Sequence, residues 1–228
     1  PFATWPVFDE ETLAAVQDVL KSGTVNYWTG QECREFEREF ADFIGTEHAI
    51  AVSNGTVALE LALIAAGVKA GDDVVVSPRT FVATGSAVAM LGATPVFADI
   101  DSTSGNVTAE TIAATLTPQT TAIIVVHAFG WPADMPAIMK LAEQHDVKVI
   151  EDCAQAHGAT IDGKKVGSFG HINAFSFCQD KIMTTGGEGG MVTTSCPELW
   201  EAAWSFKDHG KSWDACYHRE HKTIFKYL

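Results

Sequence analysis

The chain has 228 residues, of which 46% are apolar, and it carries a formal net charge of −14. A chain of this length and composition can bury a substantial core and is expected to be globular. The negative charge would repel nucleic acid, which is bound by surfaces rich in Lys and Arg, so neither DNA nor RNA is an expected partner. No apolar run approaches the roughly 20 residues that a membrane span needs, and the N-terminus lacks the pattern of a secretory signal.

Five cysteines are scattered along the chain without CxxC spacing: Cys33, Cys153, Cys178, Cys196 and Cys216. Their odd number and spacing favour reduced thiols over a disulfide framework. Together with the absent signal pattern, this predicts a cytoplasmic protein. The chain begins without Met and stops in a polar-to-aromatic stretch, which leads us to expect a fragment of a longer protein.

The first part of the chain predicts two amphipathic helices. Apolar residues recur at helical spacing over residues 9–20 and again over residues 31–44, and Gly45 ends the second helix. We expect residues 1–30 to form an N-terminal helix and arm, and residues 31–228 to form a larger ligand-binding domain.

A short buried strand over residues 48–53 passes through Asn54-Gly55-Thr56 directly into a helix over residues 57–66. This turn offers backbone N–H groups and a hydroxyl at a helix N-terminus, an arrangement that suits a phosphate monoester. Capping of the helix by Asn54 explains the turn equally well. The turn alone does not decide between these interpretations.

Apolar strands and amphipathic helices then alternate up to residue 152, and residues 163–194 change to short strand-like pieces separated by a glycine cluster. The expected strands are 73–77, 94–98, 122–127, 147–152, 173–177 and 190–194, and the expected helices are 83–91, 109–116, 135–145 and a last one from residue 198. This alternation predicts an α/β fold with a mainly parallel sheet, right-handed crossovers and helices on both faces.

Two residues stand where ligands bind in such folds. Asp152 ends a strand at the carboxyl edge of the expected sheet, although an acidic residue there can also simply cap a turn. Lys181 follows the strand at 173–177 and precedes a glycine cluster at 186–190. A lone lysine is usually solvated, but glycines that permit close backbone approach favour a site here.

Several segments, in this order, resemble a known family. They are Asn54-Gly55-Thr56, Arg79-Thr80-Phe81, Glu151-Asp152-Cys153-Ala154-Gln155-Ala156-His157-Gly158-Ala159, Phe175-Ser176-Phe177-Cys178-Gln179-Asp180-Lys181 and Gly187-Glu188-Gly189-Gly190. The set resembles the DegT/DnrJ/EryC1/StrS family of sugar aminotransferases, which depend on pyridoxal 5′-phosphate (PLP). The resemblance covers nearly the whole chain and implies the large domain of a fold-type-I, aspartate aminotransferase-like enzyme.

The resemblance implies two catalytic residues. Lys181 would form the Schiff base with PLP, and Asp152 would pair with the pyridine nitrogen of the cofactor. A carboxylate beside that nitrogen keeps it protonated, so that the ring can accept electrons when the Cα–H bond of the substrate breaks.

The resemblance also implies the remaining contacts with the cofactor. Gln155 would lie near the phenolic oxygen, and Phe81 would stack on the ring. Gly55, Thr56 and Ser176 would hold the phosphate.

The implied reaction moves an amino group from an amino acid, L-glutamate, to a nucleotide-linked keto sugar in a ping-pong sequence. Lys181 would then act as general base and acid. The family also implies a homodimer with shared active sites and a C-terminal small domain that this chain lacks. A sugar dehydratase of the same family would carry His in place of Lys181. A catalytically silent PLP-binding regulator stays open.

Other motifs favour no further cofactor. The turn after the first strand lacks the G-x-G-x-x-G of a nicotinamide oxidoreductase, and Gly210-Lys211-Ser212 does not complete a P-loop because residue 205 is Ser. The segment 216–221 is interpreted as a solvated polar segment, because its His-x-x-His spacing suits no metal site.

Two assignments stay open at this point. His157 and His209 are either active-site residues, as the resemblance implies, or structural histidines. Trp28, Thr29 and Gly30 are weighed as part of a sugar pocket.

Overall fold

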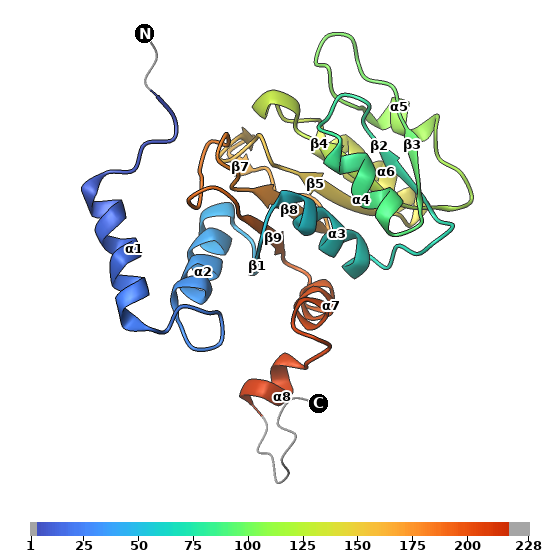
Figure 1. Cartoon of the computed structure of the whole chain (residues 1–228). Coiled ribbons are helices and arrows are strands. Elements are labelled where there is room, and N and C mark those ends of the chain that lie inside the picture. Colours follow the sequence, from blue (N-terminus) through green and yellow to red (C-terminus); the bar gives the residue numbers. More distant parts are fainter. Residues whose placement is uncertain (1–3, 219–228) are drawn as a thin grey trace.

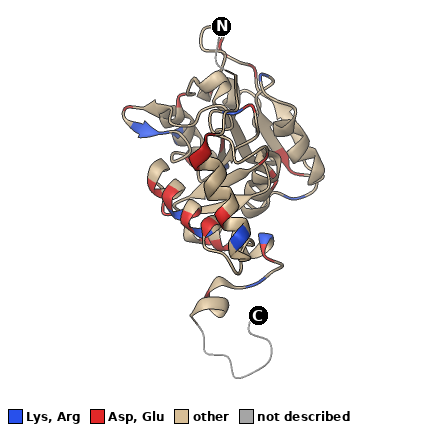
Figure 2. Ribbon diagram, turned by 60° about the vertical axis from the view of Figure 1, so that its left-hand side comes forward, with Lys and Arg blue, Asp and Glu red and all other residues tan. Residues whose placement is uncertain are grey.

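A seven-stranded sheet covered by helices forms the body of the computed structural model, which describes residues 4–218 (Figure 1). The strands lie in the order β1-β9-β8-β5-β4-β2-β3. Their bounds are β1 His48–Val52, β2 Asp73–Val76, β3 Thr94–Phe97, β4 Thr120–Val126, β5 Lys148–Asp152, β8 Ile172–Ser176 and β9 Gly190–Thr194. A separate hairpin pairs β6, Thr160–Ile161, with β7, Lys164–Lys165, and the two lysines of β7 stand out in Figure 2.

Eight α-helices and one short 3₁₀ helix lie within the described residues. They are α1 Glu10–Ser22, α2 Glu32–Ile44, α3 Gly55–Ala65, α4 Ala83–Met90, α5 Ala109–Ala113, η1 Ala128–Gly130, α6 Met135–His145, α7 Pro197–Lys207 and α8 Trp213–Tyr217.

The sheet is parallel except around one strand. β3, β2, β4, β5 and β8 pair in parallel, whereas β9 pairs antiparallel with both β8 and β1. The carboxyl ends of the parallel strands therefore meet at one edge, where open α/β sheets bind ligands. This arrangement confirms the predicted α/β class.

Alternation along the strands sorts their side chains into two cores. Val74, Ile124 and Ile150 pack in the cluster that contains residues of α3, α4 and α7. Val75 and Val149, each next to one of these, pack in the cluster that contains residues of α5 and α6. Because successive side chains point to opposite faces, the two acidic residues that end β5 must also face opposite ways.

The turn between β1 and α3 is capped by its own asparagine. The Asn54 side-chain oxygen accepts the N–H of Val57 at 2.9 Å, and Gly55 and Thr56 are the first two residues of the helix. The capping interpretation of Asn54 is thus confirmed. The N–H groups at the start of a helix have no partner within the helix, so the capped turn can still present some of them to a ligand.

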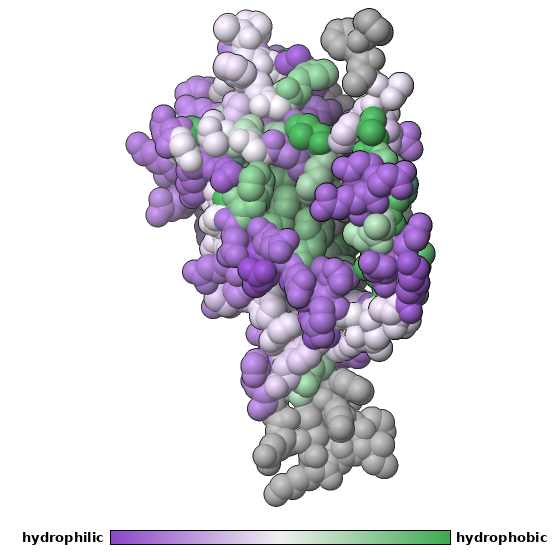
Figure 3. All heavy atoms as spheres, turned by 90° about the vertical axis from the view of Figure 1, so that its left-hand side faces the viewer, coloured by the Kyte–Doolittle hydropathy of each residue, from purple (hydrophilic) through white to green (hydrophobic). Residues whose placement is uncertain are grey.

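Helix α1 contributes nothing to the described core. None of its residues is buried, although Asp9 caps its start and Gly23 ends it in the left-handed region. Figure 3 shows apolar atoms exposed between hydrophilic ones on the side of the molecule where α1 and α2 lie. Exposed large apolar residues of α1 and of the segment before it are Trp5, Val7, Phe8, Leu13, Val16 and Leu20.

All five cysteines carry free thiols, as predicted, with Cys153 buried and Cys33 exposed. Within residues 4–218, no helix is long and apolar enough to cross a membrane.

Candidate active site

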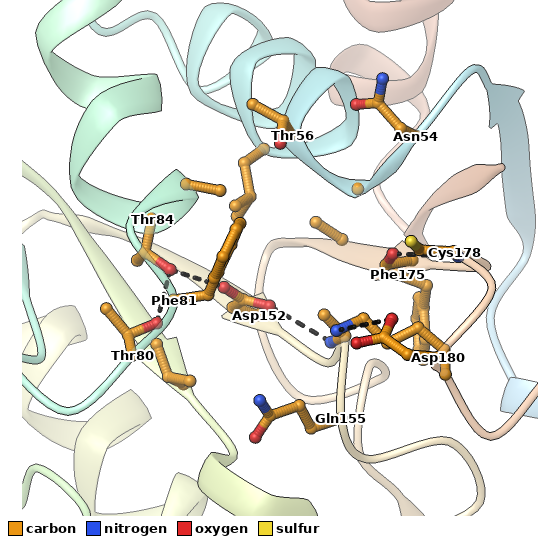
Figure 4. Close-up of a pocket in the computed structure, with 18 of the residues that line it drawn as sticks. Asn54, Thr56, Thr80, Phe81, Thr84, Asp152, Gln155, Phe175, Cys178 and Asp180 are labelled. Carbon is orange, nitrogen blue, oxygen red and sulfur yellow. Dashed lines mark hydrogen bonds and ion pairs between the residues drawn. The ribbon is translucent and has the colours of Figure 1, made fainter. Parts of the chain in front are cut away.

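A cavity of about 340 Å³ opens at the carboxyl edge of the sheet (Figure 4). It lies between the N-terminus of α3, the start of α4, the ends of β5 and β8 and the loop that follows β8. Seven of its lining residues are those that the sequence assigned to the cofactor: Gly55, Thr56, Phe81, Asp152, Gln155, Ser176 and Lys181. Residues from four separate stretches of the chain thus meet in one place.

Asp152 is the buried carboxylate of this cavity. Its Oδ2 accepts the hydroxyl of Thr84 at 2.8 Å, and its Oδ1 accepts the N–H of Ala154 at 3.2 Å. Burial raises the pKa of Asp152 above its ordinary value, while these two hydrogen bonds and the charge of Lys181 oppose that rise. A cation placed against this carboxylate would offset the cost of its burial.

Lys181 extends into the cavity from the loop after β8. Its side chain is 19% exposed, and Nζ lies 3.8 Å from Oδ1 of Asp180. Its backbone N–H donates to the carbonyl of Cys178 at 3.0 Å, and its own carbonyl accepts the indole N–H of Trp5 at 3.1 Å. The backbone of this lysine is therefore anchored on both sides while the amine faces the cavity.

The first turn of α3 packs directly on the end of β8. A Cβ added to Gly55 would stand 2.7 Å from Cβ of Ser176, so only glycine allows this approach without a shift. Ser176 is buried, and its Oγ accepts the N–H of Cys178 at 3.3 Å. Backbone N–H groups of the helix start and two hydroxyls, those of Thr56 and Ser176, thus converge as donors that suit a phosphate.

Gln155 is oriented by a strained backbone segment. Its Oε1 accepts the N–H of Phe129 at 2.7 Å, so the amide NH₂ group is left to donate toward the cavity, as Figure 4 shows. Phe129 holds φ at 56°, in the left-handed region that side chains other than glycine rarely adopt. A donor at this position fits a phenolic oxygen.

Phe81 lies on the rim of the cavity and is 67% exposed. Its ring lies across the cavity from Gln155 in Figure 4. A flat aromatic side chain with this much free surface can cover a planar ligand.

The opposite face of β5 carries a different carboxylate. Glu151 is fully buried and accepts the N–H groups of Gly167, Phe169 and Gly170 at 2.7–2.9 Å, together with Nε2 of His127 at 2.8 Å. Burial alone would raise the pKa of Glu151, but the His127 hydrogen bond and these N–H groups outweigh it and lower the pKa.

Three potential metal ligands come together on this face among the described residues: His127, Glu151 and Cys153 lie within 4.8 Å of one another. Nδ1 of His127 accepts the N–H of Ala133 at 3.1 Å, and its Nε2 is bonded to Glu151. Because both ring nitrogens and both carboxylate oxygens already have protein partners, we assign this group a structural role.

His157 is not part of the cavity lining. Its ring packs against Phe175 and Phe177, with centroids 5.6 Å away in each case. Neither ring nitrogen has a hydrogen-bond partner among residues 4–218, and burial lowers the pKa of His157 to about 4. The ring is therefore neutral near pH 7, which matches the structural interpretation. His209, at the end of α7, does not line the cavity either.

Trp28, Thr29 and Gly30 do not line this cavity, so their part in a sugar pocket stays a prediction. Trp28 instead stacks on Tyr217 and lies edge-on to Trp204. The P-loop-like segment also has a structural role, since the Ser212 side chain caps α8. Residues 219–221 of the His-rich segment lie outside the described residues.

Sequence reasoning gave no role to five polar lining residues: Thr80, Thr84, Cys178, Asp180 and Glu188. Thr80 immediately precedes Phe81, Thr84 follows it by three positions, and Asp180 immediately precedes Lys181. Closeness in sequence to the assigned residues was the signal that could have identified these three.

The sequence profile of the DegT/DnrJ/EryC1/StrS aminotransferase family matches residues 6–226. The chain belongs to this family. One relative is a UDP-N-acetyl-3-dehydro-alpha-D-glucosamine 3-aminotransferase from Acidithiobacillus ferrooxidans. It is 44% identical over 209 residues, which cover 92% of this chain and 56% of the relative.

Solved structures of this family share the fold. An aminotransferase from Psychrobacter cryohalolentis is 57% identical, with a TM-score of 0.97, and the match covers 100% of this chain and 58% of that one. NtdA from Bacillus subtilis, with its bound cofactor PMP, is 29% identical, with a TM-score of 0.82, over 94% of this chain and 47% of its own.

The chain spans about half the length of these relatives. The predicted family and fold class are confirmed, and so is the cofactor type of that family, pyridoxal phosphate.

Proposed function

We propose that this chain is the cofactor-binding part of a PLP-dependent aminotransferase that moves an amino group from an amino acid to a nucleotide-linked keto sugar. The observation that carries the proposal is the meeting of Asp152 and Lys181 in one cavity, from a strand end and a loop 29 positions further along the chain. No other pair of residues would serve PLP chemistry so specifically, because one must face a ring nitrogen and the other must supply an amine.

The residues of the cavity fit PLP group by group. The carboxylate of Asp152, whose burial raises its pKa, suits a pyridinium nitrogen, and the NH₂ group of Gln155 suits a phenolic oxygen. The donors of Gly55, Thr56 and Ser176 suit the phosphate. When bound, the cofactor supplies an electron sink for the bond that breaks at the substrate Cα.

The chain's own residues would supply the remaining functions. Lys181 would hold the cofactor through its amine, and the same amine, once free, would act as general base and acid for the proton at the substrate Cα. Asp152 would orient the ring and keep its nitrogen protonated. Phe81, on the rim of the cavity, would cover the ring and exclude water.

We also propose L-glutamate as the amino donor, a cytoplasmic location and a homodimer with shared active sites. The charges of the cavity support the dimer. Lys181 is the one cationic side chain among the described lining residues, beside the acidic Asp152, Asp180 and Glu188. A cofactor phosphate and a nucleotide diphosphate both need positive partners, which a second subunit can supply. The relative that acts on a UDP-linked sugar supports this substrate class.

The experiment is a transamination assay with the full chain, PLP, L-glutamate and a panel of nucleotide keto sugars, followed through the release of 2-oxoglutarate. Amino transfer to one of these sugars is the expected result. If the chain binds PLP and yet forms no oxo acid with any donor or sugar, it is a silent PLP-binding protein and the proposed activity is wrong. Loss of a hydroxyl from the sugar without uptake of nitrogen would instead identify a dehydratase.

A further inference from the structure

Two threonines stand behind the carboxylate of Asp152, and neither takes part in the chemistry described above. Oγ1 of Thr84 lies 2.8 Å from Oδ2 of Asp152, and Oγ1 of Thr80 lies 2.7 Å from Oγ1 of Thr84. Thr84 is fully buried on the first turn of α4. Figure 4 shows dashed lines that join Thr80 to Thr84 and Thr84 to Asp152.

Counting protons fixes the direction of these hydrogen bonds. A carboxylate only accepts, so the single hydroxyl proton of Thr84 is donated to Asp152, and Thr80 must then donate to Thr84. If Asp152 is protonated on this oxygen, both bonds can reverse, with Asp152 donating to Thr84 and Thr84 to Thr80. The forward direction stabilises the ionised carboxylate, because hydrogen bonds to a charged group are the stronger ones.

We propose that Thr80 and Thr84 form a hydroxyl relay that positions Asp152 and keeps it ionised opposite the ring nitrogen of the cofactor. This inference rests on the proposed function, since it assumes PLP in the cavity. Both threonines are positioning residues. Neither needs to touch the cofactor, and Thr84 acts only through Asp152.

Among the groups around Asp152, the Thr84 hydroxyl has the largest stabilising effect on the ionised carboxylate. Burial is the largest influence on its pKa and raises it, and the Thr84 hydrogen bond is the largest of the opposing ones. The titratable groups near it are Lys181 on the loop after β8, His127 after β4, and its neighbours Glu151 and Cys153. α4 carries no charged residue, so it contributes hydroxyls alone.

The first test uses the chain without cofactor. The carboxyl carbon of Asp152 is followed by ¹³C NMR against pH, with its signal assigned by its loss in Asp152→Asn. Thr84→Val, which removes the hydroxyl at constant shape, should raise the pKa of Asp152 by about one unit. Thr84→Ser keeps the hydroxyl and should retain the wild-type value. An unchanged pKa in Thr84→Val overturns the relay.

The second test measures binding of PLP itself by quenching of tryptophan fluorescence from pH 5 to pH 9. Thr84→Val should weaken binding about tenfold at neutral pH. It should also move the pH at which affinity falls on acidification upward by about one unit, because Asp152 then gains its proton sooner. Thr84→Ser should match the wild type. A merely structural hydroxyl would weaken binding equally at every pH, which contradicts the proposal.

Thr80→Val provides an alternative if Thr84→Val does not fold. It should shift the pKa of Asp152 and the pH dependence of PLP binding in the same direction by a smaller amount. A wild-type chain that binds no PLP refutes the proposed function and this inference with it. Normal PLP binding by the wild type, with no pH shift in either variant, refutes the relay alone.

Discussion

The contact between Gly55 and Ser176 determines whether α3 can reach the site, and it yields a sharp prediction. In Gly55→Ala the new Cβ would lie 2.7 Å from Cβ of Ser176, which is 0.7 Å closer than the 3.4 Å at which ordinary contact begins. It would also lie 3.3 Å from Cα of Ser176, so rotation of a flexible side chain cannot relieve the overlap. The N-terminus of α3 must therefore move away from β8.

The matched control is Gly85→Ala on α4. A Cβ there would meet only Cζ of Phe97, at 3.9 Å, which is ordinary van der Waals contact. Because alanine is favoured over glycine inside helices, Gly85→Ala should raise the free energy of unfolding by about 0.5–1 kcal/mol. The free energy of unfolding of Gly55→Ala should be about 1–3 kcal/mol lower than that of Gly85→Ala, which is the usual cost of overpacking.

Urea denaturation of both variants without cofactor measures these free energies of unfolding, and titration with PLP measures the effect on binding. We expect Gly55→Ala to bind PLP more weakly, because the displaced helix start no longer meets Ser176, while Gly85→Ala binds as the wild type does. Equal stability of the two variants, together with equal affinity for PLP, would show that the contact between Gly55 and Ser176 does not constrain the start of α3.

Two further predictions concern the adjacent carboxylates of β5. Burial raises the pKa of Asp152 above 3.8 in the folded chain, so its contribution to stability falls as the pH rises above that value. Asp152→Asn should then be more stable than the wild type at pH 7 without cofactor, yet should bind PLP far more weakly; thermal unfolding against pH and PLP titration check both points. The pKa of Glu151 lies below 4.5 because its hydrogen bonds outweigh burial, so its contribution is complete above pH 4.5 and is lost as the pH falls through the folded value. Glu151→Gln should therefore lower the free energy of unfolding by about 1–3 kcal/mol at pH 7, as measured by urea denaturation. Equal stability of mutant and wild type would contradict the stabilising role of the hydrogen bonds to Glu151.

The architecture was largely predictable because it depends on periodicity and on strand-end chemistry. Helix α6 and strand β9 have the predicted bounds, since Pro136 and the capping Asp134 fix the start of the helix and the glycine cluster precedes the strand. The helix predicted over 109–116 ends at Ala113, where the side chain of Thr115, just beyond it, donates back to the carbonyls of Thr111 and Ile112. Such local competition is not visible in apolar spacing.

The site was predictable where a residue type is chemically required and unpredictable where only packing selects it. Lys181 and Asp152 could be named as candidates because their segments resemble the motifs of the family, and the structure brings both side chains into one cavity. Thr84 was missed because a threonine in a helix has many ordinary roles, and only the fold brings its hydroxyl to Asp152 across 68 positions. The packing of Trp28 on Trp204 and Tyr217 was not visible in the sequence either, since both partners come from the far end of the chain.

Covalent attachment of PLP to Lys181 is measured by reduction of the PLP-loaded chain with borohydride, followed by peptide mapping. We expect a pyridoxyl group on the peptide that contains Lys181. We also expect no trapped cofactor in Lys181→Ala and unchanged trapping in Lys69→Ala, which alters an exposed lysine outside the cavity. Stable trapping on another lysine, or full trapping in Lys181→Ala, would show that Lys181 is not the residue that binds PLP.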